Sequence, residues 1–165
     1  MAKKEESEKK EKEEKQESEK KEKEEKQSCI FCEILEGKQK GNVVYENDSV
    51  VVILDAFPVT EGHLLIIPRE HLKDVLYLNE KQTNELFNMA RKAGEILVKK
   101  LEADSVNIAT APSVVQHFHL HVIPRYVYDM MGPLADLDNK RELPKEVTER
   151  IFKKIKEGFD AFQKV

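Results

Sequence analysis

Residues 117–123 alternate between histidine and apolar side chains and read His-Phe-His-Leu-His-Val-Ile. Side chains in a β-strand repeat every two residues, so this alternation predicts a strand with its three histidines on one face. Phe118 and Leu120 would point to the other face and fill a hydrophobic core. We expect this strand to cover 114–123 and to end at Pro124. The segment therefore predicts a sheet with one buried face and one face that carries imidazoles.

The imidazoles of His117, His119 and His121 suit two kinds of chemistry. Imidazole is a frequent ligand of transition metals, so the row predicts a metal site as one alternative. Neutral imidazole is also a good nucleophile near pH 7, and its protonated form can assist at an anionic substrate. A polar strand face without any chemical role is the third alternative.

The N-terminal part of the chain differs from the rest in composition. Residues 3–26 contain ten Lys and eleven Glu, and the sequence of 7–17 returns almost unchanged in 18–28. This repeat has no apolar position to bury, so it suits a solvated helix or a disordered tail. We therefore divide the chain into a charged low-complexity arm, 1–27, and one folded domain, 28–165, which is long enough to bury a core.

Net charge and hydropathy exclude several classes of protein. The chain has a net charge of −4, and −3 remains after the charged stretch is removed, which argues against a general nucleic-acid binder. No apolar run is long enough for a membrane-spanning helix. The charged N-terminus does not look like a secretory signal. We expect a cytoplasmic protein.

The remaining patterns predict an α+β fold, in which an antiparallel sheet of about five strands is covered by one long central helix and a C-terminal helix. The long helix should run from an Asn79 cap, with Gln82 as its capping-box partner, to about Glu102. The last helix should begin at Pro144 and bury a stripe of four residues, which are Ile151, Ile155, Phe159 and Phe162. Besides the histidine segment, the predicted strands are 43–45, 50–54, 63–67 and 105–109.

Several short motifs in this order resemble the histidine triad (HIT) family. Together with the histidine segment, the matching stretches are Cys29-Ile30-Phe31-Cys32-Glu33-Ile34, Val44-Tyr45-Glu46-Asn47-Asp48, Leu54-Asp55-Ala56-Phe57-Pro58, Gly62-His63-Leu64-Leu65-Ile66-Ile67-Pro68-Arg69-Glu70-His71 and Pro124-Arg125. The resemblance covers about residues 28–126. It implies an enzyme that cleaves or transfers nucleotides at the α-phosphate and that binds an AMP-like purine nucleotide.

The resemblance assigns roles to the histidines. His119 would attack the phosphorus atom and form a covalent nucleotidyl intermediate, which water then cleaves. His121 would donate a hydrogen bond to a phosphate oxygen, and His63 would support the nucleophile or the phosphate. The first histidine of the row, His117, completes the catalytic set.

The resemblance also indicates the nucleotide-binding residues. Asp55, with its neighbour Ala56, corresponds to the position that holds the ribose hydroxyls, and a carboxylate can accept two hydrogen bonds from a diol. Asn107 resembles an asparagine near the ribose and phosphate, one residue short of the usual spacing. Phe31, Ile34 and Phe57 could line the base or belong to the core.

One departure from the family pattern lies just before the row of histidines. The family usually has a glutamine four residues ahead of the first histidine, whereas this chain has Ser113 in that position. A serine hydroxyl can still donate to a phosphate but is shorter than an amide. Pro112-Ser113 partly resembles the branches that remove adenylate from DNA ends or hydrolyse mRNA caps. The departure leaves the accepted leaving group open.

Cys29-x-x-Cys32 has the spacing of one half of a zinc site. The resemblance suggests His71 and His117 as the other two ligands of a structural zinc ion, and no organic cofactor is expected. Two reduced thiols without metal are the alternative.

Three functions stay open at this point. The first is hydrolysis or transfer on adenosine phosphoramidates or related nucleotides, the second is hydrolysis of dinucleoside polyphosphates, and the third is a non-catalytic nucleotide-binding scaffold. The resemblance also implies a homodimer, for which the long helix is a reasonable interface.

Overall fold

The computed structural model describes residues 29–111 and 115–163, and the charged arm lies outside them. The chain divides into two compact units, 1–39 and 40–165. In the described part of the first unit, helix α2 covers Ile30–Leu35. The sequence patterns did not predict this short helix. It starts after Cys29, whose backbone is extended, and it ends before Gly37, whose φ of 72° is left-handed.

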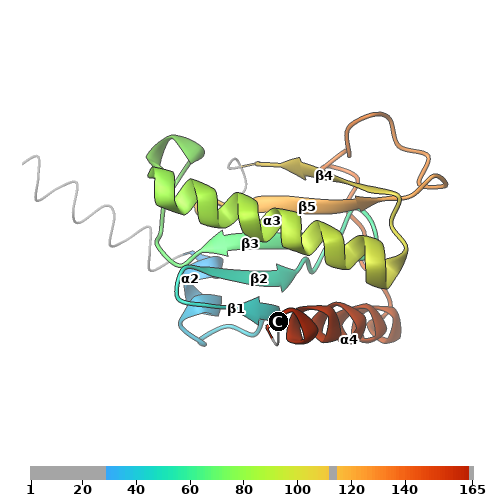
Figure 1. Cartoon of the computed structure of the whole chain (residues 1–165), viewed down its shortest axis with the longest axis horizontal. Helices are drawn as coiled ribbons and strands as arrows, with labels where there is room; N and C mark the ends of the chain where they lie inside the picture. The colour runs from blue at the N-terminus through green and yellow to red at the C-terminus, as the bar shows by residue number, and fades with distance from the viewer. Residues whose placement is uncertain (1–28, 112–114, 164–165) are drawn as a thin grey trace, which may run out of the picture. The chain divides into compact units, whose positions relative to one another are not determined.

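The second unit contains a five-stranded antiparallel sheet in the order β1-β2-β3-β5-β4 (Figure 1). Its strands are β1 (Asn42–Glu46), β2 (Val50–Leu54), β3 (Leu64–Pro68), β4 (Ser105–Ala109) and β5 (Leu120–Arg125). The predicted α+β fold class and antiparallel sheet are therefore confirmed. β2 and β4 have the predicted bounds, while β1 and β3 differ from their predictions by one residue at each end.

The histidine segment departs from its predicted strand. Pairing between β3 and β5 stops at Ile66 and Leu120, so His117 and His119 precede the strand and do not lie in it. Before Leu120 the backbone bonds elsewhere, because the N–H of Phe118 donates to the carbonyl oxygen of Leu72. At its other end, β5 continues through Pro124 to Arg125. Proline is tolerated there because it needs no ladder N–H at that position.

Two long helices of the second unit are α3 (Glu80–Leu101) and α4 (Lys145–Phe162), and a single 3-10 turn, η1 (Val75–Tyr77), precedes α3. α3 begins with the predicted capping box, in which the side chains of Asn79 and Gln82 each accept from the other's backbone N–H. α4 buries Ile151, Ile155 and Phe159 as predicted. The prediction for Phe162 is wrong, since that ring is exposed and lies under the ammonium group of Lys92.

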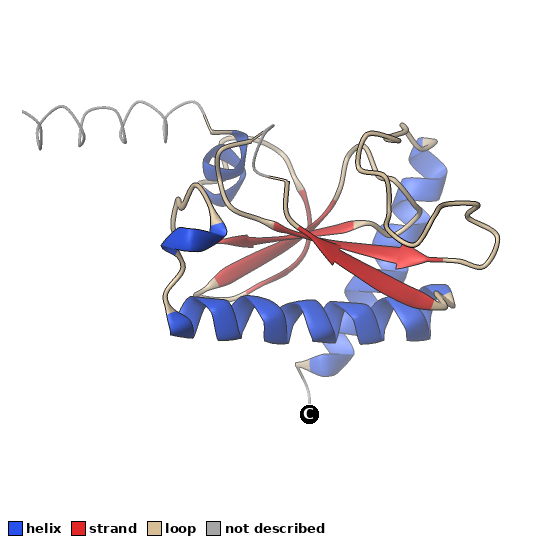
Figure 2. Ribbon diagram, turned by 90° about the horizontal axis from the view of Figure 1, so that it is seen from above, coloured by secondary structure: helices blue, strands red, loops and turns tan. Residues whose placement is uncertain are grey.

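The core lies on the sheet face that α3 covers (Figures 1 and 2). Alternate residues of the strands, such as Val52, Ile66, Leu120 and Val122, join α3 and α4 in one buried cluster. Phe118 and Leu120 belong to this cluster, as predicted. In Figure 2, loops of the second unit lie on the opposite side of the sheet from α3.

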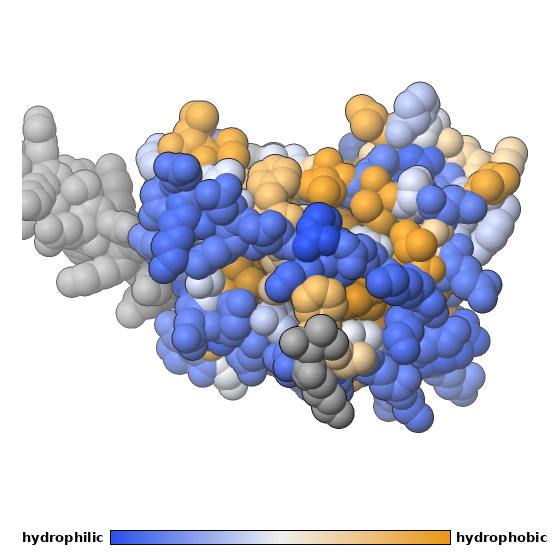
Figure 3. All heavy atoms as spheres, in the orientation of Figure 1, coloured by the Kyte–Doolittle hydropathy of each residue, from blue (hydrophilic) through white to orange (hydrophobic). Residues whose placement is uncertain are grey.

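The outer surface of this unit, seen from the α3 side, is mainly hydrophilic with separate apolar areas (Figure 3). Phe87 and Val98 on α3 are about half-exposed, as is Ile108 on β4. Across residues 29–111 and 115–163, no helix combines the length and apolar character that crossing a bilayer requires.

Candidate active site

His119 and His121 stand side by side at the start of β5, with their ring centroids 4.7 Å apart. His121 is paired with Leu65 on β3 and with Ala109 on β4, so it occupies the sheet face opposite the core cluster. Both histidines are buried. The predicted alternation thus gives the right faces, although only His121 lies within the strand.

His63 reaches the same site from a distant part of the sequence. It follows Gly62, whose φ of 93° suits glycine and turns the chain into β3. The Nε2 atom of His63 lies 3.0 Å from Nδ1 of His121. Antiparallel pairing of β3 and β5 therefore joins two imidazoles that are 58 residues apart.

The hydrogen bonds around His63 assign the protons of this pair. The backbone N–H of Val59 donates to Nδ1 of His63 at 3.3 Å, so neutral His63 carries its proton on Nε2. That proton is donated to Nδ1 of His121, so the proton of His121 is on its own Nε2. Among the described residues this buried Nε2 has no hydrogen-bond partner. The hydrogen-bonded pair therefore ends in a buried Nε2–H donor.

His119 has the opposite arrangement of its ring nitrogens. Its Nδ1 lies 2.8 Å from the carbonyl oxygen of His117. A carbonyl oxygen only accepts, so Nδ1 of His119 carries the proton and the lone pair is on Nε2. The two neighbouring histidines thus differ at Nε2: His121 has an N–H donor there, and His119 has a nucleophilic lone pair.

Burial keeps these histidines neutral. Removal from water, together with neighbouring imidazoles and the Lys140 cation, lowers the pKa of His63 and the pKa of His121 to about 3. Burial also lowers the pKa of His119, despite the hydrogen bond to His117 and the nearby Asp55 carboxylate. The site therefore holds neutral imidazoles near pH 7.

Asp55 lies beside this row, directly after β2. Its Oδ2 is 3.4 Å from Nδ1 of His63, and its Oδ1 accepts the N–H of Phe57. An ion pair with Asp55 would require a protonated His63, and the lowered pKa of His63 disfavours that form. We therefore assign the Val59 N–H as the hydrogen-bond donor to Nδ1 of His63. Ala56 and Phe57 follow in an exposed turn.

Asn107 is held by the last residue of β5 and by the segment that follows this strand. Its Oδ1 accepts from Nη1 of Arg125 and from the N–H of Ala135, both at 2.8 Å. Arg125 also binds Asp129 and the carbonyl oxygens of Met131 and Gly132. In the sequence, Arg125 stands out only as part of a motif, and nothing there indicates that it orders this loop. Ser113 lies outside the described residues.

His117 forms a second pair of imidazoles with His71, with ring centroids 4.8 Å apart. Nε2 of His117 lies 2.9 Å from the carbonyl oxygen of Pro68, so its proton is on Nε2 and its lone pair is on Nδ1. Nδ1 of His117 thus has the electron pair that a metal ligand requires.

Four other predicted residues belong to the first unit. Cys29 is at the N-cap position of α2 and Cys32 lies three residues later, and their sulfur atoms are within 4.8 Å of each other. Neither cysteine forms a disulfide with another described residue. Phe31 and Ile34 are also in α2. The roles suggested for these four residues remain predictions.

Lys140 also acts on the row of imidazoles, although it is not among the predicted site residues. Its positive charge lowers the pKa of His63, of His119 and of His121. The side chain is exposed and comes from the loop before α4. No motif marked this residue, since a lysine in a charged loop is ordinary in sequence.

The fold and this site define an α+β protein with a row of neutral imidazoles on one face of an antiparallel sheet. The family described as "Scavenger mRNA decapping enzyme C-term binding" matches residues 28–132. An uncharacterized HIT-like protein of Saccharolobus solfataricus is 38% identical over 132 residues, which cover 77% of this chain and 94% of that protein. The chain therefore belongs to the histidine triad (HIT) family and has its nucleotide-binding and hydrolase fold.

Two further relatives are informative. An adenylylsulfatase of Arabidopsis thaliana is 33% identical over 132 residues, covering 74% of this chain and 66% of that protein. A zinc-bound histidine triad family protein from Mycobacterium smegmatis has a TM-score of 0.66 at 28% identity, covering 82% of this chain and 99% of that chain.

Proposed function

We propose that this protein is a nucleotidyl hydrolase or transferase that acts at the α-phosphate of adenosine phosphoramidates or related nucleotides through His119. The observation that carries the proposal is the hydrogen bond from Nδ1 of His119 to the carbonyl oxygen of His117. It puts the lone pair on Nε2, and burial keeps that imidazole neutral and nucleophilic. The similarity to an adenylylsulfatase also supports reaction at a nucleotide phosphate.

In the proposed reaction, Nε2 of His119 attacks phosphorus and forms a P–N bond. The bond from phosphorus to the leaving group breaks, and the leaving amine keeps the electron pair and takes up a proton. Water then attacks the same phosphorus, releases a proton and displaces the imidazole as nucleoside monophosphate forms. The Nε2–H of His121 would donate to a phosphate oxygen in both steps. Asp55 and Ala56 would hold the ribose, and Asn107, Ser113, Phe31 and Ile34 would complete the nucleotide site.

The deciding experiment compares the full chain with His119→Ala. We expect His119→Ala to lose turnover of adenosine phosphoramidate while AMP binding survives, and acid quench of the unaltered chain should trap a nucleotidyl-protein adduct. Unchanged turnover in His119→Ala would contradict the proposal. Binding with neither turnover nor adduct in the unaltered chain would favour the non-catalytic scaffold instead.

A side-by-side assay of adenosine phosphoramidate and diadenosine polyphosphates would define the substrate class. We expect faster turnover of the phosphoramidate. If the diadenosine compounds react faster, the protein is a dinucleoside polyphosphate hydrolase that uses the same histidine.

We also propose a structural zinc ion bound by the thiolates of Cys29 and Cys32 and by His71 and His117. Sulfur and imidazole ligands suit Zn²⁺, and the proton assignment of His117 leaves Nδ1 for a metal. The zinc-bound relative from Mycobacterium smegmatis supports this proposal. Zinc would stabilise the fold, while His119 and His121 remain available for the substrate. Purified protein should contain about one equivalent of zinc, Cys29→Ser should contain much less, and zinc-poor protein that is otherwise stable would contradict the proposal.

A further inference from the structure

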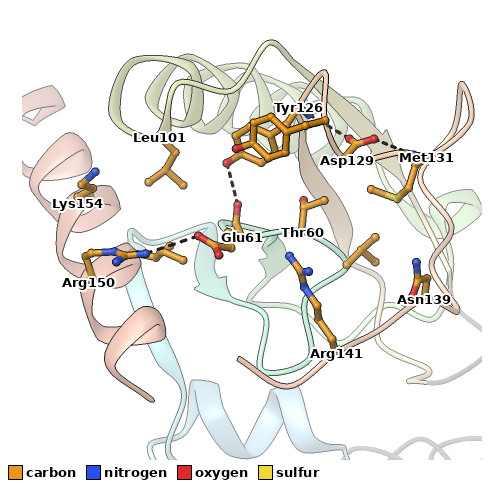
Figure 4. Close-up of a pocket in the computed structure, with 13 residues that line it drawn as sticks. Thr60, Glu61, Leu101, Tyr126, Asp129, Met131, Asn139, Arg141, Arg150 and Lys154 are labelled. Carbon is orange, nitrogen blue, oxygen red and sulfur yellow. Dashed lines mark hydrogen bonds and ion pairs between the residues drawn. The ribbon is translucent and has the colours of Figure 1, made fainter. Parts of the chain in front are cut away.

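A cavity of about 340 Å³ in the second unit has no role in the function proposed above. It lies among the turn before β3, the last turn of α3, the first half of α4 and the loop after β5 (Figure 4). His63, His119, His121 and Asp55 do not line it. Its volume is that of a small-molecule site.

Three basic side chains gather at this cavity. Arg150 and Lys154 are one turn apart on α4, so they share a helix face. Arg141 comes from the loop before α4, and Figure 4 shows its guanidinium directed into the space between that loop and Tyr126. Cations thus approach the cavity from two different elements.

The carboxylates at the cavity do not neutralise these cations. Asp129 is held by Arg125 at 2.7 Å and accepts the backbone N–H groups of Tyr126 and Met131. Glu61 is 3.9 Å from Arg150, but both side chains are largely exposed, so this ion pair is weak. No ion pair of Arg141 or Lys154 occurs in the part of the chain that the structure describes. The cavity therefore has an excess of positive charge.

We propose that this cavity is a second ligand site, which binds the phosphate group of a small phosphomonoester between Arg141, Arg150 and Lys154. A carboxylate has two oxygens in one plane and is satisfied by a single guanidinium. A dianionic phosphate has three terminal oxygens pointing in different directions, which match cations that come from more than one side. Arg150 can leave its weak pair with Glu61 to join them.

The other walls suit the organic part of such a ligand. Leu101 and Ile151 provide apolar surface, and Asn139 provides an amide. The hydroxyl of Tyr126 donates to the carbonyl oxygen of Glu61 at 3.0 Å, and burial raises the pKa of Tyr126 to about 12. The phenol therefore stays neutral and does not repel an anion. The small volume favours a sugar phosphate over a dinucleotide.

This site would adjoin the candidate active site without sharing its reactive groups. Val59 lines the cavity, and its backbone N–H donates to Nδ1 of His63. Variants at Arg141 or Lys154 leave the imidazole row intact. Failure of this proposal can therefore be distinguished from failure of the proposed catalysis.

The test titrates the full chain with ribose 5-phosphate and with inorganic phosphate at constant low ionic strength, using calorimetry and backbone amide NMR. We expect saturable binding with shifts at the amides of Thr60 and Tyr126. Loss of one charge-assisted hydrogen bond should weaken binding about tenfold in Arg141→Gln and in Lys154→Gln. The matched control is Lys153→Gln, which removes the same charge from an exposed neighbour that does not line the cavity.

Each outcome decides the proposal. Weakening in Arg141→Gln and Lys154→Gln but not in Lys153→Gln would support it, whether the sugar phosphate binds more tightly than inorganic phosphate or equally well. Equal weakening by Lys153→Gln would mean general attraction to a basic surface and would overturn it. Saturable shifts confined to His119 and His121 would place the anion in the active site and would also overturn it.

Discussion

Individual hydrogen bonds distinguish neighbouring histidines that the sequence presents as equivalent. His121 offers the buried Nε2–H, so its removal should cost transition-state stabilisation. We expect His121→Ala to lower kcat by about 10²–10³, as loss of one oxyanion donor does. His121→Gln can place an amide N–H nearby and should recover part of the rate. Steady-state kinetics on adenosine phosphoramidate would measure both, and equal rates for His121→Ala and the unaltered chain would contradict the donor role.

The buried pair His63 and His121 predicts a pH dependence of stability. Each has a pKa of about 3 when folded, against about 6.5 when exposed to water. Between these values the unfolded chain binds more protons, so the free energy of unfolding should fall as pH is lowered from 6.5 towards 3. The slope would be at most about 1.4 kcal/mol per pH unit for one group.

Urea unfolding at several pH values between about 5 and 7 would measure this slope. The control is the double variant His63→Gln and His121→Gln, which removes both titrating groups and should flatten the profile. A profile that is equally steep in the double variant would mean that other residues carry the dependence.

For individual residues, much of the site could be predicted from the sequence. The alternation of His117–His121 was enough to set Phe118 and Leu120 in the core and the histidines away from it. The contact of His63 with His121 spans 58 residues, so it depends on strand order, which local pattern does not contain. Nothing in the sequence marked Lys140, because a charge that approaches the histidines from a loop has no characteristic sequence spacing from them.

Among the elements, a local signal placed α3 correctly, the strand predicted for the histidine segment was wrong because distant contacts decide its start, and the short helix α2 was not predicted. The capping box at Asn79 is local, and it marked the start of α3 correctly. The strand predicted over 114–123 begins only at Leu120, because Phe118 bonds to Leu72 and His117 to Pro68. Pro68 ends β3 and Leu72 lies on the connection that follows it, so the start of β5 depends on contacts that the local sequence does not specify.

Gly62 lies directly before His63, in the turn that leads into β3. Its backbone conformation predicts a stability effect. Its φ of 93° disfavours any side chain, and an added Cβ would collide with Leu101 and press on Leu97. We expect Gly62→Ala to lower the free energy of unfolding by about 1–3 kcal/mol. Gly37→Ala is the matched control, because Gly37 has φ 72° but open space around it. Equal losses in both variants, measured by urea unfolding, would show that packing against α3 contributes nothing.

For the whole molecule, we expect the outer surface of α3 in the second unit to be the interface of the predicted homodimer. Phe87 and Val98 are three turns apart on α3 and share its outer face, and they are about half-exposed. β4 is an edge strand of the sheet. It is adjacent to α3, since a Cβ added to Gly94 of α3 would touch Val106 of β4. An edge strand beside apolar helix residues is a surface that a second copy could cover.

We therefore expect sedimentation equilibrium of the full chain to give about twice its mass of 19.1 kDa. Phe87→Glu places a charge in the proposed interface, where burying it without a partner is unfavourable, so this variant should sediment as a monomer. Asn88→Glu adds the same charge to the next exposed residue, which points to a different side of α3, and should remain dimeric. A monomeric unaltered chain, or a dimer that persists in Phe87→Glu, would exclude this face of α3 as the interface.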